Sequence, residues 1–199
     1  MSRGGSGGVA GPRLSWDERR DQLLDTAGAI VRAEGADALT LTRVAEDAGV
    51  TKPIAYKHFE TRIGLLKALY RRIDDQQVAA ARSALAANAD TLEECATVLA
   101  RSYVECVLHI GREFGPVTAA LATTPEIDEI LRTGRERYAD VFLQAVRRFV
   151  KLPSATGKPL LLGVVGAAET LSREVVASRL DGEAAVVLVA RIILGAVRP

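Results

Sequence analysis

The sequence predicts an all-helical protein: an N-terminal three-helix domain with a helix-turn-helix, joined by a long helix to a C-terminal helical domain. Two observations predict this fold. Apolar residues recur at helical spacing from Ser15 onward, and no stretch alternates apolar and polar residues as a half-buried strand does. Ala45 and Gly49 have the spacing of two short helices that cross closely, with a small residue at the contact and a turn glycine four positions later. The length of 199 residues permits one small and one larger domain.

Helix ends in the first part of the chain follow from capping residues and breakers. A first helix is expected to begin at Ser15, a good N-cap followed by two acidic residues, and to stop at Gly35. Short helices are expected over 41–48 and 51–59, with Thr51 as N-cap of the second, and a long helix over 62–87. We expect a disordered Gly-rich leader over 1–14, a helix-turn-helix domain over 15–80 and a second helical domain over 81–199.

The second part of the chain is expected to contain five more helices. Breakers at Gly111, 123–124, 153–157 and 181–182 divide it into 91–110, 113–122, 125–150, 158–180 and 183–197. The last two segments are apolar on nearly all sides, which favours burial in a subunit interface over burial inside one chain.

Composition restricts the classes of function. With 48% apolar and 26% charged residues and a net charge of +1, the chain is a folded protein and no polycation, so a nucleic-acid surface requires local charge. The chain shows neither a signal sequence nor a membrane-spanning stretch, which predicts a cytoplasmic protein. Its two cysteines, Cys95 and Cys106, lie too far apart on one helix to bridge, and a structural role is favoured over oxidant sensing.

Positive charge is concentrated where the second short helix ends and the long helix begins. Residues 51–72 hold six lysines and arginines and one acid, Glu60, which makes this segment +5 in a chain of +1. The side chains left exposed on the second helix are Lys52, Tyr56, Lys57 and His58, all of which can contact phosphates or base edges. We therefore expect salt-dependent binding to duplex DNA rather than an ordinary solvated basic helix.

These residues resemble a known family. The runs 39–45, 49–52 and 56–59, followed by Leu65 and Leu66, are similar to the N-terminal domain of TetR-type repressors over about residues 16–75. The resemblance implies a homodimer on a partially palindromic operator, and a small-molecule effector that changes the spacing of the two recognition helices. The DNA-binding set that it implies contains Thr42, Tyr56, His58 and Arg62 as phosphate contacts, Arg43, Lys52, Pro53 and Lys57 as base or mixed contacts, and the N-cap Thr51.

The C-terminal domain offers aromatic side chains near apolar helical faces, where a helical domain can enclose a pocket. Tyr103, Phe114, Tyr138 and Phe142 are the candidate effector contacts, although aromatics at this spacing are more often plain core. The sparse polar groups favour an apolar or amphipathic ligand. No metal or cofactor is expected.

The sequence leaves two main functional hypotheses, and a third in which the protein is a purely structural adaptor that binds neither DNA nor a ligand. The first is a ligand-responsive transcriptional regulator, most simply a repressor. The alternative is a small-molecule-binding helical protein or enzyme that retains a vestigial DNA-binding motif. Enzymatic motifs do not support the alternative, because the chain has neither a His-Glu-x-x-His metal site nor a Gly-x-Ser-x-Gly nucleophile elbow. We therefore expect a protein that is not an enzyme.

Overall fold

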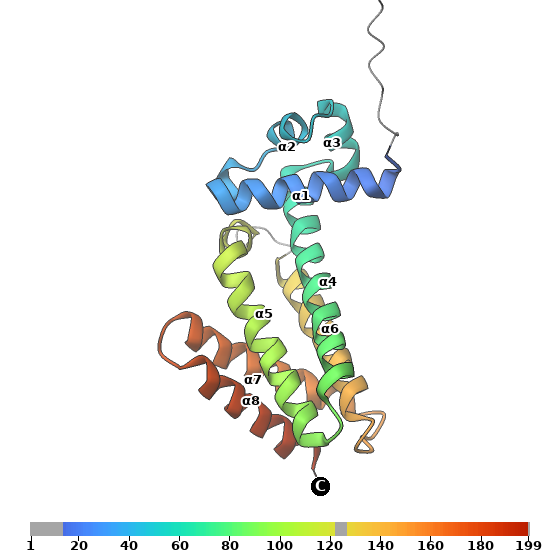
Figure 1. Cartoon of the computed structure of the whole chain (residues 1–199), viewed down its shortest axis with the longest axis vertical. Coiled ribbons are helices and arrows are strands. Elements are labelled where there is room, and N and C mark those ends of the chain that lie inside the picture. The colour runs from blue at the N-terminus through green and yellow to red at the C-terminus, as the bar shows by residue number, and fades with distance from the viewer. Residues whose placement is uncertain (1–13, 122–126, 199) are drawn as a thin grey trace, which may run out of the picture.

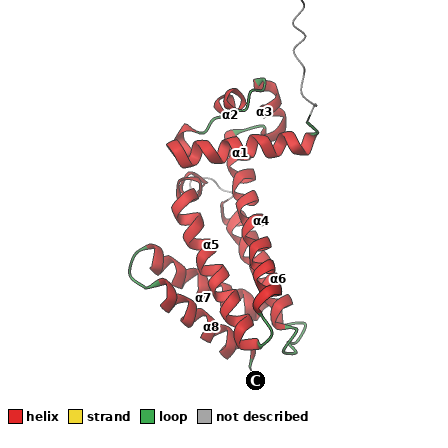
Figure 2. Ribbon diagram, in the orientation of Figure 1, coloured by secondary structure: helices red, strands yellow, loops and turns green. Residues whose placement is uncertain are grey.

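The protein is helical throughout the part that the structure, a computed structural model, describes: residues 14–121 and 127–198, the side chains of 112–114, 116, 118–121 and 127 excepted (Figure 2). The expected leader falls almost entirely outside these ranges. Figure 1 shows an elongated molecule, with α1 to α3 at one end, α7 and α8 at the other, and α4 to α6 running between them. The all-helical prediction is confirmed.

The N-terminal helices begin and end as their capping residues dictate. Helix α1 (Trp16–Glu34) starts with a capping box, in which the Ser15 hydroxyl accepts from the Glu18 amide and the Glu18 carboxylate accepts from the Ser15 amide. It stops at Gly35, whose φ of +86° suits glycine, and a 3-10 turn, η1 (Ala36–Ala38), follows. The next two helices are α2 (Leu41–Asp47) and α3 (Lys52–Phe59), and Gly49 between them has a φ of +67°.

The turn between α3 and α4 (Arg62–Asn88) is the tightest place in the N-terminal half. The Thr61 hydroxyl caps α4 by accepting from the amide of Gly64. A Cβ atom at position 64 would lie only 2.1 Å from the carbonyl oxygen of Phe59. Glycine is therefore required here by close backbone approach, although it is a poor helix former.

The second half consists of α5 (Leu92–Leu121), α6 (Ile127–Val146), α7 (Gly157–Val176) and α8 (Gly182–Val197). The predicted break at Gly111 is wrong, because α5 continues through it. A Cβ atom at Gly111 would lie 3.5 Å from a methyl group of Val176, so this glycine faces the end of α7. The packing of Ile110 and Val117, on either side of this glycine, against the core outweighs the roughly 1 kcal/mol that glycine costs inside a helix. The expected break at 123–124 lies outside the described residues.

Two clusters of buried side chains form the interior. One joins α1 to the first half of α4, and it includes Val117 from the end of α5 and Ile130 from the start of α6. The other begins at Val78 and fills the space between α4, α5, α6, α7 and α8. Ile110 packs against both clusters. Among the helices of the described ranges, none combines the length and apolar character needed to cross a bilayer.

Candidate nucleic-acid interface and ligand cavity

Helix α3 is held by one face and presents the other to solvent. Ala55 and Phe59 are buried against the N-terminal core, whereas Lys52, Tyr56 and Lys57 are exposed. Tyr56 is 48% exposed, a large fraction for an aromatic side chain that has a core next to it. The exposed face therefore carries two ammonium groups and a phenol, which are donors for phosphate and base-edge oxygens.

The start of α1 braces the end of α3. The Trp16 ring stacks on the His58 ring, with 3.7 Å between their centroids, and the Lys57 ammonium lies 5.5 Å from the centre of the indole. Arg20 donates to the carbonyl oxygen of His58 and stacks over the ring of Phe59. Trp16 itself is 51% exposed. Sequence reasoning missed Trp16 and Arg20, because only the fold brings them next to residues about 40 positions away.

The His58 ring is partly buried where α1 meets α3. Burial, followed by the nearby charges of Arg20, Lys57 and Arg19, lowers the pKa of His58 below its ordinary value of 6.5. Its Nδ1 atom is buried and has no hydrogen-bond partner among the described residues. The lowered pKa favours the neutral form of His58, which can offer a phosphate a hydrogen bond but no positive charge.

Carboxylates on α1 and α2 pair with two of the predicted base-contacting cations. Arg43 pairs with Asp47 at 2.7 Å and with Glu34 at 3.0 Å, and Lys52 lies 3.6 Å from Glu46. All five side chains are substantially exposed, so these pairs are weak and can exchange for phosphate contacts.

The other predicted DNA-binding residues divide into exposed and structural positions. Thr51 and Pro53 are exposed at the start of α3, and Thr42 is half-buried on α2. Arg62 donates to the carbonyl oxygens of Leu39 and Ala36, so its guanidinium fastens η1 to α4. Arg72, one of the six lysines and arginines of residues 51–72, pairs with Asp21 and Asp25 of α1. The positive charge of this segment therefore does not all lie on the exposed face of α3.

A cavity of about 400 Å³ lies between α4, α5, α6 and α7. Tyr103 and Tyr138 line it, with 4.9 Å between their ring centres and an edge-to-face arrangement. Phe142 lies outside the lining, in the core behind Tyr103. Phe114 belongs to α5, but its side chain is outside the described part of the structure.

The structure adds polar residues to this cavity that spacing did not single out. Tyr70 and Asp74 reach it from α4, and Arg135, Glu169 and Arg173 reach it from α6 and α7. Asp74 is only 5% exposed, and its carboxylate pairs with Arg137 at 2.5 Å. Burial raises the pKa of Asp74, and Arg137 opposes that shift. Within the described residues, no group of three or more His, Cys, Asp and Glu side chains is placed to hold a metal ion.

Comparison with known proteins identifies the N-terminal half. Residues 23–69 match the family described as "Bacterial regulatory proteins, tetR family", which is the segment from mid-α1 to mid-α4 that contains α2 and α3. The HTH-type transcriptional activator FasR of Mycolicibacterium smegmatis is 26% identical over 164 residues, which are 82% of this chain and 74% of FasR. The domain that contains α2 and α3 is therefore that of a TetR-type regulator. The protein is a DNA-binding transcriptional regulator, and α3 is the second helix of its helix-turn-helix.

Solved structures extend the likeness to the whole TetR-type fold. A regulator of the TetR/AcrR family from Thermobifida fusca is 21% identical, with a TM-score of 0.62, and the match covers 91% of this chain and 99% of that one. RolR in complex with resorcinol is 19% identical, with a TM-score of 0.62 over 92% of this chain and 88% of RolR. At these identities the likeness establishes the fold, including the helical domain that contains the cavity.

Proposed function

We propose that this TetR-type regulator is a homodimeric repressor that binds a partially palindromic operator through α3 and leaves it when a small molecule occupies the cavity. The observation that carries the proposal is the exposed face of α3, on which Lys52, Tyr56 and Lys57 face solvent at the end of the molecule remote from α7 and α8 (Figure 1). In a dimer joined at the opposite end, two such helices can enter successive major grooves.

The DNA contacts that we propose are those of the predicted set, with their roles adjusted to the structure. Lys52 and Lys57 supply charge, and Tyr56, Thr51 and Thr42 supply hydrogen bonds. Arg43 has to exchange its carboxylate partners for DNA. Arg62 contributes through the backbone that it fastens more than through its own guanidinium.

The last two helices provide the dimer surface in this proposal. Large apolar side chains are exposed on α7 and α8: Leu160, Val176, Val187, Leu188 and Ile192. A set of this kind is costly to leave in water, and a second copy of the same two helices would cover it in a four-helix arrangement.

The cavity is positioned to influence the DNA-binding domain. Tyr70, Ile110 and Leu131 line the cavity and also pack in or against the N-terminal core. A ligand that fits one arrangement of these side chains better than another shifts the equilibrium between two relative positions of the domains. The size of that shift is limited by the difference in the ligand's affinity for the two arrangements. RolR, which has the same fold, is known in complex with resorcinol, and this supports a small-molecule effector here.

The direction of regulation needs its own test, because FasR is an activator. We expect repression, in which transcription of a reporter behind the operator falls when the protein is supplied. An increase in transcription would make the protein an activator and leave the operator and dimer proposals intact.

Selection of bound duplexes from a random library, followed by sequencing, tests the DNA-binding proposal. We expect a palindromic site with half-sites about one helical turn apart. Lys57→Ala should weaken binding to that site and reduce its salt dependence by about one phosphate contact. Lys151→Ala, the same change at an exposed lysine in the loop after α6, is the matched control and should bind as the unchanged protein does.

An alternative outcome of this selection favours the second hypothesis. If no sequence is enriched, even with protein stripped of ligand, the chain is a small-molecule-binding protein with a vestigial motif. In that case Lys57→Ala and Lys151→Ala should behave alike.

A further inference from the structure

The shape and walls of the cavity restrict the size of a ligand. One part of the lining is aliphatic: Val107, Ile110, Leu131, Val176 and Ala177. The volume of about 400 Å³ is at the small end of ligand sites, which suits a compact body of one or two rings.

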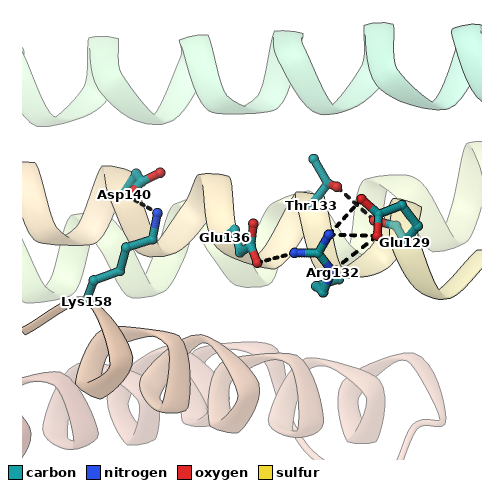
Figure 3. A network of polar contacts seen from close by, with 6 residues as sticks. All are labelled: Glu129, Arg132, Thr133, Glu136, Asp140 and Lys158. Carbon is teal, nitrogen blue, oxygen red and sulfur yellow. Dashed lines mark hydrogen bonds and ion pairs between the residues drawn. The ribbon is translucent and has the colours of Figure 1, made fainter. Parts of the chain in front are cut away.

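The charged groups of the lining already have partners. Asp74 pairs with Arg137, and Glu169 pairs with Arg173 at 2.5 Å and with Arg135 at 3.2 Å. Arg135 and Arg173 share this carboxylate, and Arg173 extends into solvent. Farther along α6, Arg132 is held between Glu129 and Glu136 (Figure 3). The two carboxylates and two guanidinium groups of the lining sum to zero, so a ligand that carries a full charge would lose its hydration without finding a net counter-charge in the cavity.

The hydroxyl of Tyr138, a neutral group in the lining, lacks the partners that the charged groups have. The Tyr138 side chain is 4% exposed, and within the described part of the chain its hydroxyl makes no hydrogen bond of ordinary geometry. Its polar neighbour is the buried thiol of Cys106, which is a weak donor and a weak acceptor. A buried hydroxyl without a partner is costly, and a ligand oxygen that reaches it would remove that cost.

Gly134, one turn before Tyr138 on α6, also lines the cavity. A Cβ atom at Gly134 would lie 3.9 Å from both Asp74 Oδ1 and Tyr70 Oη, while the other oxygen of Asp74 is the one paired with Arg137. Gly134 therefore leaves room beside a carboxylate oxygen and a phenol that both line the cavity.

We propose that the cavity binds an uncharged molecule with a compact one- or two-ring apolar body and a hydroxyl or carbonyl oxygen that hydrogen bonds to Tyr138. This inference rests on the proposed function, because it names the class of effector that the cavity takes. Ligands that carry a full charge are excluded from it, whichever sign they have.

The protonation behaviour of the lining agrees with this assignment. Burial raises the pKa of Tyr70 to about 12 and that of the Cys106 thiol to about 11. Burial likewise raises the pKa of Tyr138 far above its ordinary value. The cavity disfavours the ionised forms of its own side chains, and the same desolvation acts on a charged ligand.

Four probes of one shape test the proposal on the full-length protein. These are 2-naphthol, naphthalene, 2-naphthoate and 2-naphthylmethylammonium, with dissociation constants measured by equilibrium dialysis at pH 7. We expect 2-naphthol to bind about five-fold more tightly than naphthalene and at least about ten-fold more tightly than either ion. Tighter binding of the carboxylate or of the ammonium would overturn the proposal, and so would the absence of binding by all four.

Two tyrosine variants locate the hydrogen bond. Tyr138→Phe should remove the preference for 2-naphthol over naphthalene while leaving naphthalene binding unchanged. Tyr103→Phe, which also removes a hydroxyl from the lining, is the matched control and should keep that preference. Equal effects of the two variants would contradict the assignment to Tyr138.

Release of operator DNA is measured separately with the same probes. Binding of 2-naphthol without DNA release would support the ligand class and contradict the effector role in the proposed function. Release by a charged probe that binds more tightly would support the effector role and overturn the ligand class.

Discussion

The two domains differ in where they place their polar groups. In the DNA-binding domain the interior is apolar, and the cations and the phenol of α3 lie on the outer face. In the helical domain and the part of α4 that packs against it, Asp74 and the Tyr138 hydroxyl lie inside, beside a cavity. A domain that binds a polyanion needs polar groups at its surface, whereas a domain that encloses a small molecule has to bury some and hold them in place.

This difference suggests that the two domains respond to substitution for different reasons. The first should be most sensitive to changes in close packing, and the second to changes that leave a buried polar group unpaired. Four predictions test this contrast.

The largest effect is expected at the turn between α3 and α4. Gly64→Ala places a methyl group 2.1 Å from the Phe59 carbonyl oxygen, so the backbone has to move, at a cost of about 3 kcal/mol. Thermal unfolding measures this loss of stability. Gly28→Ala in the same domain is the control, because its Cβ would meet its neighbours at ordinary contact distances of 3.4 Å and more. A Gly64→Ala protein as stable as Gly28→Ala would contradict the requirement for glycine.

The second prediction concerns the buried charge of the helical domain. Arg137→Met should lower the free energy of unfolding at pH 7 by about 2 kcal/mol, because it leaves the Asp74 carboxylate buried without its cation. Asp74 has a raised pKa when folded, so the folded state retains its proton more readily than the unfolded state does. Its contribution to stability is therefore largest at low pH and is lost as the pH rises through the raised pKa.

It follows that the penalty of Arg137→Met should shrink as the pH falls and Asp74 becomes protonated. Asp74→Asn in the same background should recover part of the loss at pH 7. Arg132→Met, at an exposed arginine of the same helix, should have little effect at either pH. A penalty that does not depend on pH would show that Arg137 acts by packing alone.

A smaller effect is expected in DNA binding from the brace at the start of α1. Trp16→Ala removes the ring that stacks on His58, so the end of α3 becomes less ordered and operator affinity should fall by about five-fold, at nearly unchanged thermal stability. Trp16→Phe keeps an aromatic ring and should retain most of the affinity. Fluorescence anisotropy of a labelled operator measures the affinities of both variants. Wild-type affinity in Trp16→Ala would show that the Trp16 ring does not brace α3 for DNA binding.

The smallest effect is expected from a surface ion pair. Arg101 pairs with Glu183 through two contacts of 2.6 and 2.7 Å that join α5 to α8, but both side chains are well exposed. A double-mutant cycle with Arg101→Ala and Glu183→Ala should give a coupling of about 0.5 kcal/mol, which decreases with salt. A coupling above about 2 kcal/mol would mean that this pair behaves as a buried one.

The sequence was informative where a local rule decides the structure. Ser15, Gly35 and Gly49 mark helix ends of the DNA-binding domain, because caps and turn conformations depend on a few neighbouring residues. Thr51 stands at the N-cap position of α3, as predicted, but its side chain makes no capping hydrogen bond. The break predicted at Gly111 was wrong because Ile110 and Val117, on either side of it, pack against cores that other helices form, and this favours a continuous α5.

Contacts between distant segments also limited what could be predicted of the two sites. Tyr103 and Tyr138 could be proposed from their helical faces, but Tyr70 and Asp74 enter the cavity from a helix that the sequence associates with DNA binding. The partners of Trp16, Arg20 and Arg62 are set by the crossing of α1, α3 and α4, which no spacing along the chain specifies.

The contribution of α5 and α6 to the N-terminal core has a consequence for protein engineering. Val117 is fully buried in that core, and Ile130 is nearly so, yet both are encoded far downstream of α4. A hybrid regulator made by exchanging the first 80 residues for those of another family member would place foreign side chains around these two. Hybrids should therefore remain well folded when positions 117 and 130 are exchanged together with the DNA-binding domain whose core they complete.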